Sequence, residues 1–163
     1  MAESISVPQN AAKAEIYQAI LPQIFALTTN ETDLIANLAN ITAVLKEAFG
    51  FFWVGFYLDK GSDLVLGPFQ GTLACTRIPY SKGVCGAAYR EKNTMLVPDT
   101  DLFPGHIACC SLTKSEIVVP VFAGEKVVAV LDVDSDKLAD FDETDKLYLE
   151  QLCDFVGKNL FSR

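Results

Sequence analysis

Hydrophobic residues in the first third of the chain recur at the spacing of helices. Between Lys13 and Leu27 they return every three or four positions, and Pro22 is expected to kink or divide this helix. A second apolar stripe runs from Asp33 to Phe49, with Gly50 placed to end it. Residues 1–12 are largely polar and predict a loose lead-in. Two helices are therefore expected before residue 50.

After Gly50 the pattern changes to the β-branched and aromatic residues typical of strands. A hairpin is predicted for FFWVGFYLD and LVLG, which KGSD separates, and a further strand for TLACTRIP. A short helix is predicted for SKGVCGAAYREK, followed by a brief strand over residues 94–97. Two more strands are expected in SEIVVPVF and EKVVAVLDVD, which Ala123-Gly124 joins.

The chain closes with an amphipathic pattern in FDETDKLYLEQLCDFVGKNLFSR. Asp142 or Thr144 would cap this helix, and its apolar side includes Leu147. We predict a single α+β domain over residues 1–163, with a largely antiparallel sheet of about six strands and the N-terminal and C-terminal helices packed on one face. The long segment from Pro98 to Ser115 is predicted to be a functional loop.

Composition narrows the function classes. The 163 residues are 50% hydrophobic, which suits one folded domain and excludes a disordered chain. A formal charge of −8 argues against nucleic acid or an anionic membrane surface as a partner. No apolar run reaches the roughly 18 residues of a membrane-spanning helix. The first residues lack the basic start and apolar stretch of a signal peptide, so a soluble cytoplasmic protein is expected.

The cysteines are candidates for chemistry, and there are five of them: Cys75, Cys85, Cys109, Cys110 and Cys153. An odd number without an export signal argues against a structural disulfide framework. There is no CxxC pair, and the HxxC spacing of His106 and Cys109 has no matching partner, so no metal site is expected. Cys153 lies on the apolar side of the last helix and is predicted to be structural, whereas Cys109 lies in a glycine- and proline-containing loop.

The single histidine, His106, could serve Cys109 as a base, as in thiol hydrolases. Those enzymes usually bring the histidine from elsewhere in the fold, so a pocket-lining role is expected here instead.

Acidic and aromatic residues share faces of the predicted strands. Asp132 and Asp134 point to one face at the end of their strand, and Glu116 begins the strand before it, so a hairpin could bring the three together. An ordinary solvated strand end is the alternative. Trp53 and Tyr57 also share a face, where core packing is the simpler explanation.

Five motifs occur in order along the chain: GPFQG, GVCG, GHIAC, SEI and LD-x-D. From about Trp53 to the end, the sequence resembles the free methionine-(R)-sulfoxide reductases, small proteins built on a GAF domain. Cys75, Cys85 and Cys109 match the three cysteines of that family. The resemblance implies an enzyme that reduces the (R)-sulfoxide of free L-methionine, and not of methionine residues inside proteins.

The resemblance also implies a division of roles among the cysteines. Cys109 would attack the sulfoxide sulfur, release methionine and become a sulfenic acid. Cys75 or Cys85 would then form a disulfide with it, which thioredoxin reduces, so no cofactor is expected. The sequence leaves open which of the two does so. Cys110 stands where relatives usually carry a residue without a thiol, which adds a further candidate for the pairing.

Binding residues follow from the same resemblance. Trp53 and Tyr57 match an aromatic wall that packs on the methyl group of the substrate. Glu116, Asp132 and Asp134 match acidic residues that bind the ammonium group and polarise the sulfoxide oxygen, with Asp134 counted as catalytic. The assembly state stays open between a monomer and a homodimer. A GAF domain that senses a small molecule is the main alternative, although it would leave the three cysteines unexplained.

Overall fold

The computed structural model describes residues 4–107 and 109–161. Its helices and strands follow the predicted order, with a short 3-10 helix, Thr100–Leu102, in the long loop. The helices are α1 (Lys13–Thr28), α2 (Leu34–Phe49), α3 (Gly83–Glu91) and α4 (Glu143–Asn159). The strands are β1 (Trp53–Asp59), β2 (Asp63–Gln70), β3 (Arg77–Pro79), β4 (Met95–Val97), β5 (Ser115–Ala123) and β6 (Lys126–Ser135).

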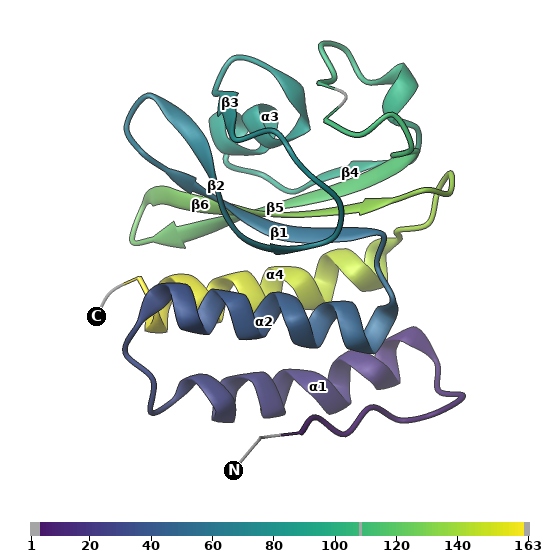
Figure 1. Cartoon of the computed structure of the whole chain (residues 1–163), viewed down its shortest axis with the longest axis vertical. Helices are drawn as coiled ribbons and strands as arrows, with labels where there is room; N and C mark the ends of the chain where they lie inside the picture. Colours follow the sequence, from purple (N-terminus) through teal and green to yellow (C-terminus); the bar gives the residue numbers. More distant parts are fainter. Residues whose placement is uncertain (1–3, 108, 162–163) are drawn as a thin grey trace.

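The strands form one six-stranded sheet in the order β3-β2-β1-β6-β5-β4, and every neighbouring pair is antiparallel. On one face of the sheet α2 and α4 pack directly against the strands, and α1 packs on those two helices as an outer layer (Figure 1). On the opposite face lie α3 and the long connections around it (Figure 1). The predicted α+β class, antiparallel sheet and placement of the terminal helices are confirmed.

Local sequence signals set the helix boundaries. The Asp33 side chain accepts a hydrogen bond from the Ala36 amide, and Gly50 ends α2 with a φ of 65°, a conformation that a residue with a Cβ atom adopts reluctantly. At α4 the cap is Asp142, whose carboxylate accepts from the amides of Thr144 and Asp145. No helix in the described part of the chain is long and apolar enough to cross a membrane.

Of the kink or division expected at Pro22, the division is wrong, and so is the placement of Leu147 on the apolar side of the last helix. Pro22 does not divide α1, which runs without a break to Thr28, because its neighbours Ile20, Leu21 and Ile24 are buried and hold the helix across the missing hydrogen bond. Leu147 is 52% exposed, since the buried side of α4 is formed instead by residues such as Leu149, Leu152 and Val156.

The strand predicted for TLACTRIP is also largely wrong, because only Arg77–Pro79 is a strand. The carbonyls of Thr72 and Cys75 accept hydrogen bonds from the Trp53 indole and the Tyr57 hydroxyl, so they face the interior and not a neighbouring strand. Residues 71–76 therefore form a loop over the sheet.

Between residue 4 and Lys13 the N-terminal segment has no helix or strand, but it is attached more firmly than its composition predicts. The backbone amide and carbonyl of Ser6 exchange hydrogen bonds with the Gln23 side chain on α1. Ile5 and Val7 pack against the core beneath the helices.

Candidate functional site

The site lies on the face of the sheet away from the helix layer, where three central strands place chemically active side chains side by side. Strand register sets Trp53 of β1 opposite Asp134 of β6, and Asp134 opposite Glu116 of β5. In the next row of this face Asp132 lies opposite Gly55. The predicted grouping of the three carboxyl groups is thus a direct result of strand pairing.

The aromatic residues form one wall of the site. Trp53 stacks on Phe69 with ring centroids 5.3 Å apart, and its centroid lies 6.0 Å from that of Tyr57. Both predicted residues are buried, and their polar atoms are fixed by bonds of 3.0 Å to the Thr72 carbonyl and 2.9 Å to the Cys75 carbonyl. Gly55 makes this possible, because a Cβ atom there would lie 2.5 Å from the indole ring.

The first two family cysteines come from different elements. Cys75 lies in the loop over the sheet, and Cys85 lies in α3 with its thiol free and buried. The third, Cys109, belongs to the long loop, which is held in place by a bond from the Gly83 amide to the Gly105 carbonyl and by the Thr100 hydroxyl bonded to the Thr113 carbonyl.

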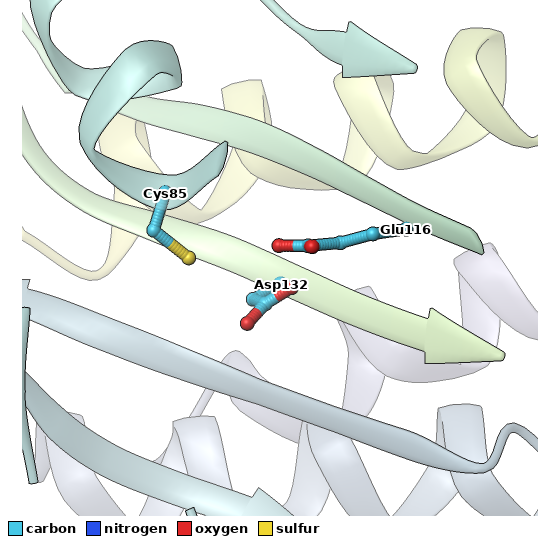
Figure 2. A group of neighbouring side chains, drawn as sticks. All are labelled: Cys85, Glu116 and Asp132. Atoms are coloured by element: carbon cyan, nitrogen blue, oxygen red, sulfur yellow. The ribbon is translucent and has the colours of Figure 1, made fainter. Parts of the chain in front are cut away.

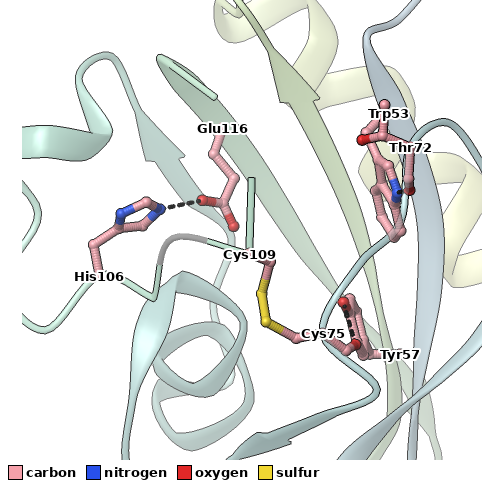
Figure 3. Close-up of a disulfide and its surroundings, with 7 residues drawn as sticks. All are labelled: Trp53, Tyr57, Thr72, Cys75, His106, Cys109 and Glu116. Carbon is pink, nitrogen blue, oxygen red and sulfur yellow. Dashed lines mark hydrogen bonds and ion pairs between the residues drawn. A yellow bond between two sulfur atoms is a disulfide. The ribbon is translucent and has the colours of Figure 1, made fainter. Parts of the chain in front are cut away.

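A disulfide joins Cys75 to Cys109, with 5.3 Å between their Cα atoms (Figure 3). Of the two partners that the sequence left open, the structure therefore pairs Cys75 with Cys109 and leaves Cys85 as a thiol. Cys110 is also free and lines the same pocket. Cys153 lies apart from the site, buried with its Sγ 4.0 Å from the Val119 carbonyl on the helix side of the sheet, where a structural thiol was predicted.

The His106 side chain points toward the carboxyl group of Glu116 and not toward the disulfide (Figure 3). Its Nε2 atom lies 3.7 Å from an Oε atom of Glu116, and burial lowers the pKa of the imidazole more than nearby Asp101 raises it. His106 is thus a pocket-lining residue in this structure, as expected.

Burial dominates the electrostatics of the pocket. It raises the pKa of Glu116, of Asp132 and of Asp134 well above the ordinary carboxyl range, and the charge of each neighbouring carboxylate raises them further. Burial also raises the pKa of the Cys85 thiol, with the Asp132 charge as the next cause. These three carboxyl groups therefore hold their protons to a higher pH than exposed carboxyl groups do.

The cavity bounded by these groups is small. Its volume is about 30 Å³, which is room for about two water molecules. Trp53 and Tyr57 form one side, the three carboxyl groups the floor, and Cys109 belongs to the lining. Among the contributors that sequence reasoning missed are Gly55, whose missing side chain admits the indole, and the exposed Leu73 at the edge of the pocket. No motif signals either of them.

Comparison with known proteins places the chain in a family. The GAF domain model matches residues 33–160, and the chain is therefore a member of the GAF domain family. "GAF domain-containing protein A" of Dictyostelium discoideum is 56% identical over 153 residues, covering 93% of this chain and 96% of that protein. The free methionine-R-sulfoxide reductase of Escherichia coli is 42% identical over 141 residues, 86% of each chain.

A solved structure of free methionine-R-sulfoxide reductase from Neisseria meningitidis, in complex with its substrate, superposes with a TM-score of 0.94 at 52% identity. The match covers 98% of this chain and 96% of that one. Within the GAF domains, the chain belongs to the free methionine-R-sulfoxide reductase family, which confirms the resemblance found in its motifs.

Proposed function

We propose that this protein reduces free L-methionine-(R)-S-oxide to L-methionine by thiol chemistry. The observation that carries the proposal is the Cys75–Cys109 disulfide, which lies beside a pocket made of an aromatic wall and three buried carboxyl groups. Relatives named for this activity support the same assignment.

The reaction begins at Cys109. Its thiolate attacks the sulfoxide sulfur and forms a bond between the two sulfur atoms. The oxygen is protonated and passes to the Cys109 sulfur as the sulfur–oxygen bond and the new sulfur–sulfur bond break, so methionine leaves and Cys109 becomes a sulfenic acid. The oxygen is a poor leaving group unless it is protonated. Asp134, whose pKa is raised by burial and by the charge of Asp132, holds a proton to a higher pH than an exposed aspartate and is the proposed donor.

Cys75 completes the oxidative half of the cycle. Its thiol attacks the sulfenic sulfur, water leaves, and the disulfide seen in this structure forms. A thioredoxin dithiol then reduces that disulfide by exchange and is itself oxidised. Cys85 is less suited to this step, because its thiol is buried on α3 among carboxyl groups that raise its pKa and oppose the thiolate.

Recognition of the free amino acid follows from charge. The ammonium group of free methionine sulfoxide can pair with Glu116 and Asp132. Among the described residues, no cationic side chain lies within hydrogen-bond distance of either carboxyl group. A peptide bond removes that ammonium group, so a methionine residue inside a protein loses this interaction. Trp53 and Tyr57 supply the apolar surface for the methyl group.

The activity is tested by following NADPH oxidation with thioredoxin and its reductase. Wild type is expected to reduce the free (R)-sulfoxide and to react poorly with its N-acetylated form. Cys109→Ser should lose turnover entirely, because the attacking sulfur is gone. Cys75→Ser should release about one equivalent of methionine and then stop, since the sulfenic acid lacks its partner. Full steady-state activity in Cys109→Ser would refute the mechanism, and Cys110→Ser serves as the matched thiol control.

A further inference from the structure

Three potential metal ligands meet on the floor of the pocket, and the proposed mechanism leaves one of them without a chemical task. The Cys85 Sγ atom and one carboxylate oxygen each of Glu116 and Asp132 all lie within 4.8 Å of one another. They come from α3, β5 and β6 and point toward a common centre (Figure 2). All three side chains are buried, with exposed fractions of 3%, 6% and 6%.

A second observation is that one buried oxygen of this centre lacks a hydrogen-bond partner. The Oδ1 atom of Asp132 is buried and has no hydrogen-bond partner within the described part of the chain. Buried carboxylate oxygens are nearly always bonded to a donor or a cation. The substrate ammonium could fill this place in the reduced protein. With the disulfide closed, the cavity of about 30 Å³ has room for an ion but not for an amino acid of the size of methionine.

We propose that Cys85, Glu116 and Asp132 bind one thiophilic divalent cation of the zinc class. One thiolate and two carboxylates match the ligand types of zinc, and the bound cation replaces the thiol proton and any proton on the two carboxyl groups, which pass to solvent. Neighbouring ligand atoms in a tetrahedral zinc site lie about 3.4–3.6 Å apart, so atoms within 4.8 Å of one another need to approach by about 1.4 Å at most. The fourth position falls to water or to His106, whose Nε2 atom lies 3.7 Å from Glu116.

Occupation of this site has a regulatory consequence, which rests on the proposed function. The cation takes the two carboxylates that would otherwise bind the substrate ammonium. Zinc and methionine sulfoxide therefore compete for the reduced protein. In the disulfide form, the same three ligands stay available, because Cys85 is not part of the disulfide.

The disulfide form offers the sharpest test, since Cys75 and Cys109 can no longer bind metal and only Cys85, Cys110 and Cys153 remain as thiols. Titration with Co²⁺ should produce the near-ultraviolet charge-transfer band of a thiolate–cobalt bond, saturating at one equivalent. Cys110→Ser and Cys153→Ser should keep the band, and Cys85→Ser should lose it. A band that disappears with Cys110, or no band in wild type, overturns the proposal.

Two further variants cover the case in which Cys85→Ser does not fold, as judged by circular dichroism. Glu116→Gln and Asp132→Asn keep the thiol and should each weaken Co²⁺ binding by at least about tenfold. Unchanged affinity in both also overturns the proposal.

Competition is measured in a single turnover of the reduced protein without thioredoxin, whose own dithiol binds zinc. Zn²⁺ should slow the release of methionine, and excess sulfoxide should restore the rate. Inhibition that is independent of sulfoxide concentration contradicts competition at this site. If the protein reduces no sulfoxide at all, the proposed function fails, while the cobalt band of the disulfide form still decides the metal site.

Discussion

The two faces of the central strands differ completely although they are built from alternate residues of the same segments. On β1, Val54 and Phe56 point into the helix layer, while Trp53 and Tyr57 point into the pocket. On β6, Leu131 faces the helices, whereas the next residue, Asp132, faces the pocket. One register therefore sets both an apolar core and an acidic site.

This contrast separates stability from function. The helix face consists of well-buried aliphatic and aromatic side chains, whose removal from water stabilises the fold. The pocket face buries carboxyl groups with raised pKa values, which cost stability whenever they ionise. Substitution on the helix face of a strand should consequently lower stability, whereas substitution of the next residue, on the pocket face, should lower activity.

The largest effect on stability is expected on the helix face. Leu131→Ala removes a fully buried side chain between the sheet and the helices and should lower the free energy of unfolding by about 2–5 kcal/mol. Chemical denaturation measures this change. The fraction that remains folded should keep the wild-type KM for sulfoxide, and a tenfold change in KM would show that the two faces are coupled.

The adjacent residue tests the opposite face. Asp132→Asn should reduce kcat/KM by about 10- to 100-fold, equivalent to about 1.4–2.7 kcal/mol, because an amide cannot pair with the substrate ammonium as a carboxylate does. Its free energy of unfolding at pH 7 should stay within about 1 kcal/mol of wild type or rise, because a strained buried acid is removed. A loss of stability like that of Leu131→Ala would contradict this division of roles.

The acidic face also predicts a pH dependence of stability. Because Glu116 and Asp132 have raised pKa values in the folded protein, the folded state holds more protons than the unfolded state above the ordinary carboxyl range near pH 4. Their contribution is fully present below that pH and is lost as pH rises through the folded pKa values. Each such proton changes the free energy of unfolding by up to about 1.4 kcal/mol per pH unit.

Denaturation of wild type and of the double variant Glu116→Gln, Asp132→Asn between pH 4 and 8 measures the contribution of these two carboxyl groups to the pH dependence of stability. The wild type should lose stability relative to the double variant as pH rises. Parallel curves for the two proteins would mean that the pair titrates normally.

The smallest effect is expected at Cys153. Cys153→Ala removes one buried sulfur from the helix side of the sheet and should cost on the order of 1 kcal/mol of stability. Sulfoxide reduction should be unchanged. Loss of turnover in a folded variant would show that Cys153 takes part in the redox chemistry, which contradicts its assignment as a structural thiol on the helix side of the sheet.

The features that the sequence predicted depend on local periodicity. Alternation on β6 placed Asp132 and Asp134 together, and the Asp33 and Gly50 signals located α2 almost to the residue. The sequence could not decide between Cys75 and Cys85, because the choice depends on where two loops meet over the sheet. It also could not show that residues 71–76 form a loop, since the bonds from Trp53 and Tyr57 that shape it join residues 18 and 19 positions apart.

Under the proposed mechanism, the disulfide beside the pocket also determines the order of the steps in the reaction cycle. While Cys75 and Cys109 are joined, the cavity beside them has a volume of about 30 Å³, so we expect a second sulfoxide to bind only after the disulfide is reduced. Under the proposed mechanism we expect methionine to leave before the reductant acts, and the reductant to finish before the next sulfoxide binds. Such alternation gives double-displacement kinetics, with parallel lines in double-reciprocal plots. We therefore expect no substrate inhibition of the oxidised protein at high sulfoxide concentration. Under oxidative load, the supply of reductant should limit the turnover rate.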